Sequence, residues 1–215
     1  MFQPEKIDFT KTKTFSARDR HNLVRIDNMA VPGQEKGPLF TSPEFDVLVE
    51  KLKKARDEKR TITCFIGAHV IKCGLSRYLI WLMENGYITH LASNGAGSIH
   101  DFELAYLGGT SEHVPTAIED GSFGMWEETG RWMNEAIREG DAHGYGYGQS
   151  LAAYIDAHPE RFPNKQDCVF YRAFQMGVPM TYHVTIGTDI IHQHPYADFG
   201  AIGRTSGVDF AYFCH

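Results

Sequence analysis

The chain has 215 residues, of which 42% are hydrophobic and 22% charged, so it can bury a substantial core and is not disordered by composition. A formal net charge of -6, with one Lys/Arg-dense stretch at 51–60, argues against a nucleic-acid partner or an anionic membrane surface. The N-terminus lacks the apolar run of a secretory signal, and no stretch reaches the ~18 consecutive apolar residues that a membrane span needs. The four cysteines form no C-x-x-C pair, which indicates reduced thiols. We therefore expect a cytoplasmic protein.

Residues 1–40 are polar and are interrupted by Pro32-Gly33 and Gly37-Pro38, which predicts an N-terminal arm that lies on the body or on a neighbouring subunit. Regular structure is expected from residue 41 onward. Ser42 before Pro43 predicts the start of a helix, and the apolar pattern continues that helix to about residue 60. The β-branched and aromatic run over 61–67 then predicts a buried strand.

Further elements alternate along the chain. A helix is predicted over 75–83 and a second strand over 87–92. Helices are expected at about 98–107, 114–119, 125–138 and 146–157, and a last strand at 180–186. Strands separated by single helices imply right-handed crossovers and a mostly parallel, helix-covered sheet. The sequence therefore predicts an α/β fold with a three-layer, Rossmann-like parallel sheet over residues 41–215.

Residues 205–215 end on apolar side chains without a polar tail, which is typical of a helix stopped in mid-course. Two explanations are open. Either this helix docks onto a partner, or the chain is a fragment of a longer protein and the domain 41–215 is truncated at its C-terminus.

The turn Ser93-Asn94-Gly95-Ala96-Gly97 joins the second predicted strand to the next helix. In parallel α/β sheets ligands bind beyond the carboxyl ends of the strands, where helix N-termini offer free N–H groups. Gly95 and Gly97 permit a tight turn and the close approach of a ligand, such as a phosphate or a carboxylate. The spacing is not G-x-G-x-x-G, however, and an ordinary loop explains it almost as well.

Polar side chains gather at the same predicted edge of the sheet. The histidines are suited to proton transfer and the carboxylates to holding a cation. Asp101 is equally well explained as a first-turn partner of the helix dipole. His192 and His194, with His69 or Asp189, would suit a metal ion, although H-x-H spacing alone is unspecific. The set comprises His69, Lys72, Asn94, His100, Asp101, Glu103, Asp189, His192 and His194.

The segment 120–128 is another candidate for the site. Its flanking glycines are typical of a mobile lid, with Phe123, Met125 and Trp126 to cover a ligand or a dimer partner. Packing of these aromatic residues at a helix entry is the alternative.

Three segments resemble the deoxyhypusine synthase family. Residues 66–80 are similar to its strand-loop-helix, where a Thr-Ser-Asn-x-x-x-Ser-Gly segment contacts the cofactor. Residues 91–101 resemble its Thr-Thr-Ala-Gly-Gly-x-x-Glu-Asp turn, and residues 179–191 resemble its later strand and Asp-Gly-Ser-x-Gly-Asp loop. The resemblance covers about residues 60–110 and 175–195, and is closer to a bacterial branch that carries Asn-Gly-Ala-x-x-x-His-Asp-Phe-Glu and Asp-Gly-Ser-Phe-Gly-Met.

This resemblance implies a Rossmann-like NAD-binding fold, commonly tetrameric, with sites between subunits. In the family's true synthases NAD oxidises spermidine, and an enzyme lysine captures the butylimine before passing it to a protein lysine. The family's Gly-Gly-Gly-x-x-Lys-His-His segment and its Trp-Gly-Lys nucleophile do not occur in this sequence, and Lys72 lies in a different segment. His69 stands where the family has Asn. Carried over by position, the cofactor-binding residues would be Ser93, Asn94, Gly95, Ala96 and Asp189, with Gly97 in the same turn.

The first functional hypothesis is therefore an NAD-dependent enzyme, a transferase or oxidoreductase, that acts on an amine or polyamine substrate. We expect a homo-oligomer, a dimer or a tetramer, with neither nucleic acid nor membrane as a partner. A metal-dependent hydrolase or lyase using His192 and His194 is one alternative, and a catalytically inactive NAD-binding or interaction protein is another. Lys72 has the simpler explanation of a solvated lysine. The candidate catalytic residues are His69, Lys72, His100 and His192, and the candidate substrate-binding residues are Asp101, Glu103 and His194.

Overall fold

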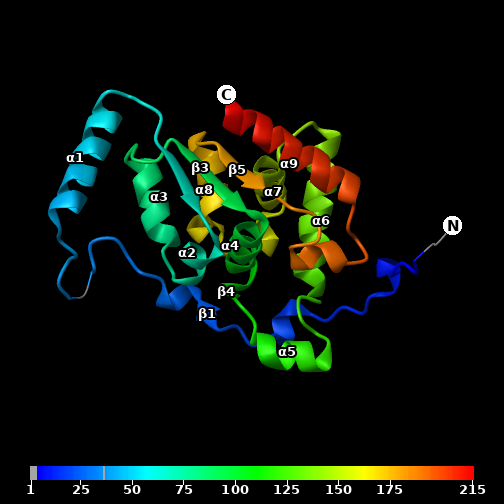
Figure 1. Ribbon diagram of the computed structural model, residues 1–215. Coiled ribbons are helices and arrows are strands. Elements are labelled where there is room, and N and C mark those ends of the chain that lie inside the picture. Colours follow the sequence, from blue (N-terminus) through cyan, green and yellow to red (C-terminus); the bar gives the residue numbers. More distant parts are fainter. Residues whose placement is uncertain (1–3, 36) are drawn as a thin grey trace.

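The computed structural model describes residues 4–35 and 37–215 and shows an α/β fold (Figure 1). Its centre is a parallel sheet in the order β2-β3-β5, formed by Thr63–Ile66, His90–Asn94 and Met180–His183. A separate antiparallel pair joins β1 (Val24–Arg25) to β4 (Gly109–Thr110). The predicted class, an α/β fold with a parallel sheet, is confirmed.

Helices supply most of the remaining ordered structure. The first long helix begins as the sequence predicts, because the Ser42 hydroxyl accepts a hydrogen bond from Phe45 N at 3.1 Å and Pro43 opens the first turn. Short 3-10 turns occur at Phe9–Lys11, Ala17–Asp19, Ile26–Asn28, Pro159–Arg161, Lys165–Asp167 and Ile190–Gln193. The α-helices are α1 (Pro43–Asp57), α2 (Ala68–Lys72), α3 (Ser76–Glu84), α4 (Gly95–Leu107), α5 (Val114–Asp120), α6 (Glu127–Ala142), α7 (Tyr147–Ala157), α8 (Val169–Met176) and α9 (Phe199–Cys214).

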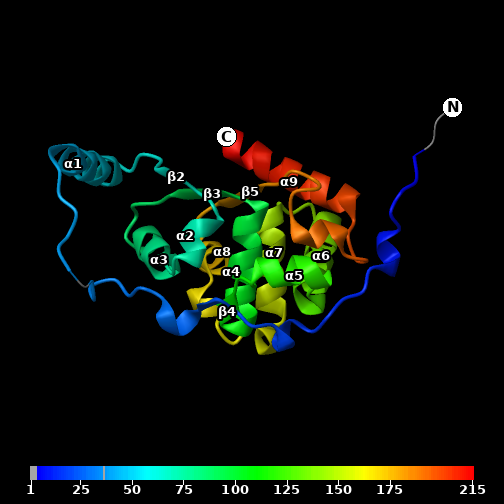
Figure 2. The same cartoon turned by 60° about the horizontal axis from the view of Figure 1, so that its bottom comes forward.

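Helices lie on both faces of the sheet, as the side chains of β5 show. Tyr182 is fully buried against Tyr147 of α7 and Phe170 of α8. The next residue, His183, points to the opposite face and meets Phe213 of α9 edge-on. Figure 2 shows the same arrangement, with α9 above the sheet and α4, α7 and α8 below it.

Helix α9 also completes the outer edge of β5. The Asp209 carboxylate accepts hydrogen bonds from the backbone N–H of Tyr182 at 2.7 Å and of Gly148 at 3.0 Å. The Ser206 hydroxyl accepts from Val184 N at 3.0 Å and donates to Tyr182 O at 3.1 Å. Side chains of a helix thus satisfy the backbone groups that a fourth strand would otherwise pair, so the edge is covered.

The predicted buried strand at 61–67 is shorter and lies at the other edge of the sheet. Only residues 63–66 form β2, and Phe65 is 68% exposed. Its β-branched and aromatic composition correctly indicated a strand, but it could not indicate that one face of this edge strand stays uncovered.

The second strand and the helix after it begin at residues other than those the sequence predicts. The strand expected at 87–92 begins at His90, because Tyr87 N and Ile88 N still bond to Leu82 O at the end of α3. The helix expected from Ser98 begins at Gly95, since the Asn94 side chain accepts from Gly97 N at 3.0 Å and caps the helix there. The glycines therefore form the first turn of α4 and not a separate loop.

The prediction of single-helix crossovers is wrong. The connection from β2 to β3 contains both α2 and α3, and the connection from β3 to β5 contains five helices, α4 to α8. The second crossover is long because it also contains α6 and α7, which pack on each other and on α9, while α7 in addition packs on α8 and β5.

The N-terminal segment packs along the helices near the cavity described below. Ala17 is completely buried and Met29 is 5% exposed. Phe15 N donates to Met125 O at 2.8 Å, and β1 pairs with β4. Within 4–35 and 37–215, none of the helices combines the length and apolar character needed to cross a membrane.

We expect Asp209→Ala to lower the free energy of unfolding by about 3 kcal/mol, because two buried N–H groups lose their acceptor. Urea denaturation followed by circular dichroism measures the change. Asp141→Ala is the control, since Asp141 forms an ion pair with Arg204 at the exposed surface of α9 and its loss should leave stability nearly unchanged. Similar midpoints for the two variants would contradict the role assigned to Asp209.

Candidate functional site

A cavity of about 260 Å³ lies beside the start of α4, at the carboxyl end of the sheet. Its walls come from segments that are far apart in the sequence: the N-terminal arm, α2, α4, residues 111–123 around α5, and the loop after β5. Polar and charged lining residues are Arg20, Lys72, His100, Glu103, Ser111, Glu112, Thr188 and Asp189, and the apolar ones are Ala96, Ile99, Val114, Phe123 and Ile190.

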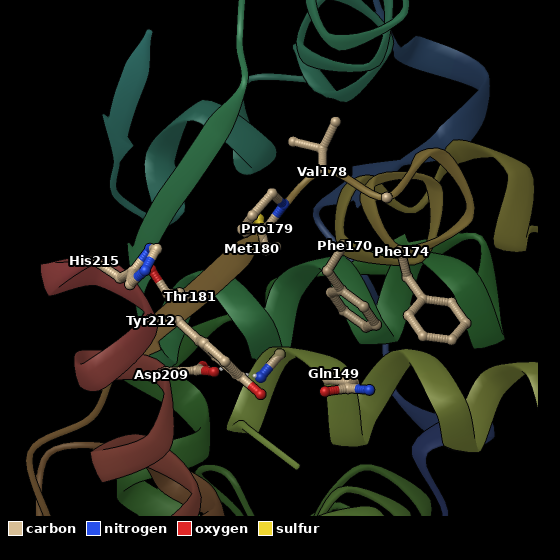
Figure 3. Close-up of a pocket in the computed structure, with 12 residues that line it drawn as sticks. Gln149, Phe170, Phe174, Val178, Pro179, Met180, Thr181, Asp209, Tyr212 and His215 are labelled. Atoms are coloured by element: carbon tan, nitrogen blue, oxygen red, sulfur yellow. Dashed lines mark hydrogen bonds between the residues drawn. The ribbon is translucent and has the colours of Figure 1, made fainter. Parts of the chain in front are cut away.

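A second, larger cavity of about 360 Å³ lies between α7, α8, the start of β5 and the end of α9 (Figure 3). Its walls are mainly apolar, and Phe170, Phe174 and Tyr212 contribute rings. Its single carboxylate, Asp209, already accepts backbone hydrogen bonds that hold the fold together. The smaller cavity is lined by three carboxylates, an imidazole and two cationic side chains, so we take it as the candidate functional site.

A buried chain of charged and polar groups forms one wall of the smaller cavity. Arg20 Nη1 donates to Glu103 Oε1 at 2.7 Å, and these side chains are 3% and 1% exposed. The same oxygen accepts from Thr129 Oγ1 at 3.0 Å, and the second carboxylate oxygen accepts from Thr110 Oγ1 at 2.5 Å. Burial alone would raise the pKa of Glu103, but the charge of Arg20 and these hydrogen bonds outweigh it and lower the pKa. Glu103 is therefore an ionised carboxylate.

The chain continues to His100 and fixes its tautomer. Thr110 gives its single hydroxyl proton to Glu103, so in its 2.7 Å hydrogen bond with His100 Nδ1 it must act as the acceptor. His100 then carries its proton on Nδ1, and Nε2 is left as an acceptor. Burial lowers the pKa of His100 to about 4, so the ring is neutral at physiological pH. A neutral acceptor of this kind can receive a hydrogen bond from an ammonium group.

Three charged residues that line the cavity each keep one buried atom without a hydrogen-bond partner among residues 4–35 and 37–215: Arg20 Nη2, Glu112 Oε2 and Asp189 Oδ2. We call these the open polar atoms. Burial raises the pKa of Asp189 to about 6. Burial also raises the pKa of Glu112, although the Trp126 side chain and the Gly124 amide, which donates to Oε1 at 3.0 Å, both oppose the rise. Buried polar atoms normally find partners, which makes this cluster a candidate for ligand contact.

The glycines of α4 make room for the protein's own side chains. A Cβ at Gly95 would collide with the carboxylate of Asp189, and a Cβ at Gly97 would collide with the hydroxyl of Ser93. The predicted close approach at these glycines therefore exists, but the Asp189 carboxylate makes it at Gly95 and the Ser93 hydroxyl makes it at Gly97. Asp189 lies against the positive end of the α4 dipole, which favours a negative charge there.

His192 and His194 hold the loop that presents Asp189. His192 Nδ1 accepts from the backbone N–H of Gly187 at 3.0 Å and of Asp189 at 3.2 Å. His194 forms a 2.8 Å hydrogen bond with Gly124 O, and its ring lies against Gly130 of α6. Neither histidine lines the cavity. In the part of the chain that the structure describes, no three His, Cys, Asp or Glu side chains form a group that could hold a metal ion.

The other predicted residues are distributed around this site. Asp101 lies on the far side of α4, where it accepts from Val169 N and Phe170 N at 3.0 Å each and so holds the start of α8. Burial raises its pKa to about 6. His69 is exposed on α2, one turn before Lys72 at the cavity wall. Ser93 is buried, and Asn94 is exposed at the start of α4.

Sequence reasoning missed Arg20, Thr110 and Glu112. Arg20 lies in the polar arm, where nothing in the local sequence distinguishes it from its neighbours. Thr110 and Glu112 follow the Gly108-Gly109 pair, and that pair indicates only the end of a helix. These residues reach the cavity because β1 pairs with β4. The two strands lie about 85 positions apart, and no periodic pattern in the sequence predicts that they pair.

Comparison with known proteins supplies no family for this chain. No family model matches it, and no curated protein matches it. Among solved structures, ArgZ, an arginine dihydrolase from the ornithine-ammonia cycle in cyanobacteria, is similar with a TM-score of 0.47 and 17% identity over 79% of this chain and 22% of that one. A conserved LOR/SDH-like protein from Methanococcus maripaludis S2 gives a TM-score of 0.41 and 18% identity over 75% of this chain and 48% of its own.

This chain thus spans about a fifth of the length of ArgZ and about half of the LOR/SDH-like protein. Neither is a deoxyhypusine synthase by its description, so the resemblance stated from the sequence stays a prediction. The fold and the site together define an α/β protein with a small acidic cavity at the carboxyl end of a parallel sheet.

We expect Gly95→Ala to lower the free energy of unfolding by about 1–3 kcal/mol, because the added methyl displaces Asp189 from its place against α4. Gly203→Ala on α9 is the matched control: it also lies within a helix, no atom lies within 4 Å of the added Cβ, and Ala there should be neutral or stabilising. Thermal unfolding of both variants measures the difference. Equal stability of the two would contradict the contact between Gly95 and Asp189.

Proposed function

We propose that this protein is an enzyme that acts on a small amine held in the acidic cavity, with NAD as its cofactor. The observation that carries the amine is the pairing of two open carboxylate oxygens, on Glu112 and Asp189, with the neutral acceptor His100 around one cavity. An ammonium group has three N–H donors and a positive charge, and it can satisfy three such acceptors at once.

The charges on the cavity wall favour a cation. Glu103, Glu112 and Asp189 contribute three carboxylates, whereas Arg20 and Lys72 contribute two positive charges. Since Arg20 is already paired with Glu103, the remaining two carboxylates dominate one side of the cavity. The raised pKa values of Glu112 and Asp189 show how strongly burial opposes their charges, and a bound cation would relieve that penalty.

The support for NAD is separate and comes from the family resemblance of residues 91–101 and 179–191 alone. The surface of Gly95 and Gly97 does not suit a pyrophosphate, because Asp189 and Ser93 occupy it. The chemistry that bound NAD would supply is a hydride acceptor for the amine-bearing carbon of the substrate.

The role of this chain's own residues follows from the geometry. Glu112 and Asp189 would bind the amine, and His100 would orient it through the acceptor that Thr110 and Glu103 fix at Nε2. Val114, at the start of α5, and Phe123, after its end, line the cavity and would exclude water. His192 and His194 would position Asp189 and the segment at Gly124 without contacting the amine.

The amine site is tested by titrating n-butylamine into the protein at pH 7.5 by calorimetry. We expect saturable binding that Glu112→Gln weakens about tenfold or more, because a charge-assisted contact is lost. Glu119→Gln is the control, since Glu119 is exposed on α5 and does not line the cavity. An unchanged affinity in Glu112→Gln, or no binding to the unaltered protein, would overturn the proposal.

The affinity for butylamine should also depend on pH. Asp189 loses its proton as pH rises through its pKa of about 6, and only the ionised form attracts the ammonium group. Affinity is therefore expected to rise about tenfold between pH 5 and pH 7, following the ionised fraction. Asp189→Asn should flatten this rise, and a pH profile identical to that of the unaltered protein would exclude Asp189 as the group responsible.

NAD binding is tested by thermal unfolding. If NAD binds the folded chain, 1 mM NAD raises the melting temperature by the linkage relation. No shift with either NAD or NADH would remove NAD from the proposal, while the amine titration would still decide on the cavity.

A further inference from the structure

We infer that the ligand of the cavity is a zwitterionic α-amino acid with an apolar side chain and not a simple amine or a polyamine. This inference rests on the proposed amine site and adds to it the open polar atom that an amine leaves unused, Arg20 Nη2. An α-amino acid carries a carboxylate beside its ammonium group, so it can pair with acceptors and with a guanidinium donor in one small space.

The position of Arg20 makes it a receptor for a carboxylate. Its side chain is 3% exposed and is held at two of its nitrogens, by Asn22 Oδ1 at 2.8 Å and by Glu103 Oε1 at 2.7 Å. The third nitrogen, Nη2, is buried without a hydrogen-bond partner among residues 4–35 and 37–215, and Arg20 is one of the residues that line the cavity. Because the guanidinium is planar and already fixed, a bound carboxylate would lose little entropy in ordering it. Lys72 lines the same cavity and adds a second positive charge.

The two kinds of open polar atom divide the cavity chemically. Glu112 Oε2 and Asp189 Oδ2 accept, and Arg20 Nη2 donates. A diamine or polyamine satisfies only the two acceptors and brings more positive charge toward Arg20 and Lys72, whereas a dicarboxylate satisfies only the donor. A zwitterion satisfies both sets without adding net charge, which is the complementary arrangement.

The rest of the lining indicates the side chain. Ile99, Val114, Phe123 and Ile190 give the cavity apolar walls between its polar groups. The volume of about 260 Å³ lies just below the range of roughly 300–1,000 Å³ typical of sites for drug-sized ligands. A single amino acid of the size of leucine is therefore the class of molecule that the walls and the volume fit together.

The test compares three probes that differ by one group. L-Leucine has both charges, 3-methylbutylamine lacks the carboxylate, and 4-methylpentanoate lacks the amine. Calorimetry at pH 7.5 is expected to give at least a tenfold tighter binding for leucine than for either of the other two, since each loses one charge-assisted contact.

Two variants assign the preference to its residue. Arg20→Lys keeps the positive charge that Glu103 requires but removes the open nitrogen, so leucine should bind about as weakly as 3-methylbutylamine, whose own affinity stays unchanged. Arg18→Lys is the matched control, because Arg18 lies two residues away on the same arm and does not line the cavity. Lys72→Met removes the second positive charge at the cavity wall without disturbing the buried ion pair, and it should likewise reduce the preference for leucine over 3-methylbutylamine.

The outcomes separate this inference from the amine proposal. If leucine and 3-methylbutylamine bind equally well, or if Arg20→Lys leaves the preference for leucine intact, the zwitterion inference is overturned and the amine site stands. If none of the three probes binds, or if 4-methylpentanoate binds most tightly, both proposals are overturned.

Discussion

The cavity depends on the buried ion pair between Arg20 and Glu103. Both side chains are almost completely removed from water, and such charges are tolerated only where pairing and further hydrogen bonds compensate for the lost hydration. Here Thr110, Thr129 and Asn22 provide them. Taking away one partner of such a pair typically costs about 3–5 kcal/mol, because the other charge stays buried. The pair therefore fixes the arm on α4 and, through Thr110, the tautomer of His100.

The same constraint explains why a small sheet can support a complex site. Three parallel strands give one carboxyl edge, and the groups gathered there come from the arm, from α4 and from the loop after β5. α9 takes the place of a further strand through Asp209 and Ser206, so the loop between β5 and α9 is anchored at both ends. Its inner hydrogen bonds, made by His192 and His194, then set the position of Asp189. The site is thus held by buried polar contacts as much as by the apolar core.

Local signals in the sequence predicted the fold better than they predicted the site. The capping residue Ser42, the apolar periodicity of α3 and the β-branched run of β2 are properties of neighbouring residues, and each indicated the correct element. Where a helix begins depends on which local hydrogen bonds form. Because the Asn94 side chain caps the helix, α4 begins at Gly95 and not at Ser98. Whether a predicted residue lines the cavity depends on tertiary packing: Glu103 and Asp101 are two positions apart on α4, yet one faces the cavity and the other holds α8. No single sequence states which way a buried helix is turned when it is apolar on nearly every side.

The glycines of α4 and the open polar atoms belong to one physical argument. Gly95 is required because the Asp189 carboxylate packs directly against the start of α4. Asp189 is held there by its loop, in which the His192 ring accepts hydrogen bonds from backbone N–H groups. The second oxygen of Asp189 lies against Gly95, with His192 Nε2 3.9 Å away, and it has no hydrogen-bond partner among residues 4–35 and 37–215. A buried polar atom without a hydrogen-bond partner lowers the free energy of unfolding by about 1–3 kcal/mol. Three such atoms at one cavity therefore reduce stability locally, as is common at functional sites. A ligand that pairs these atoms would offset that cost only in the folded chain, so occupancy and stability are linked. The ligand would contact both the arm that carries Arg20 and the loop that carries Asp189. Because the ion pair joins that arm to α4 at Glu103, binding would stabilise the arm, the helix and the loop together.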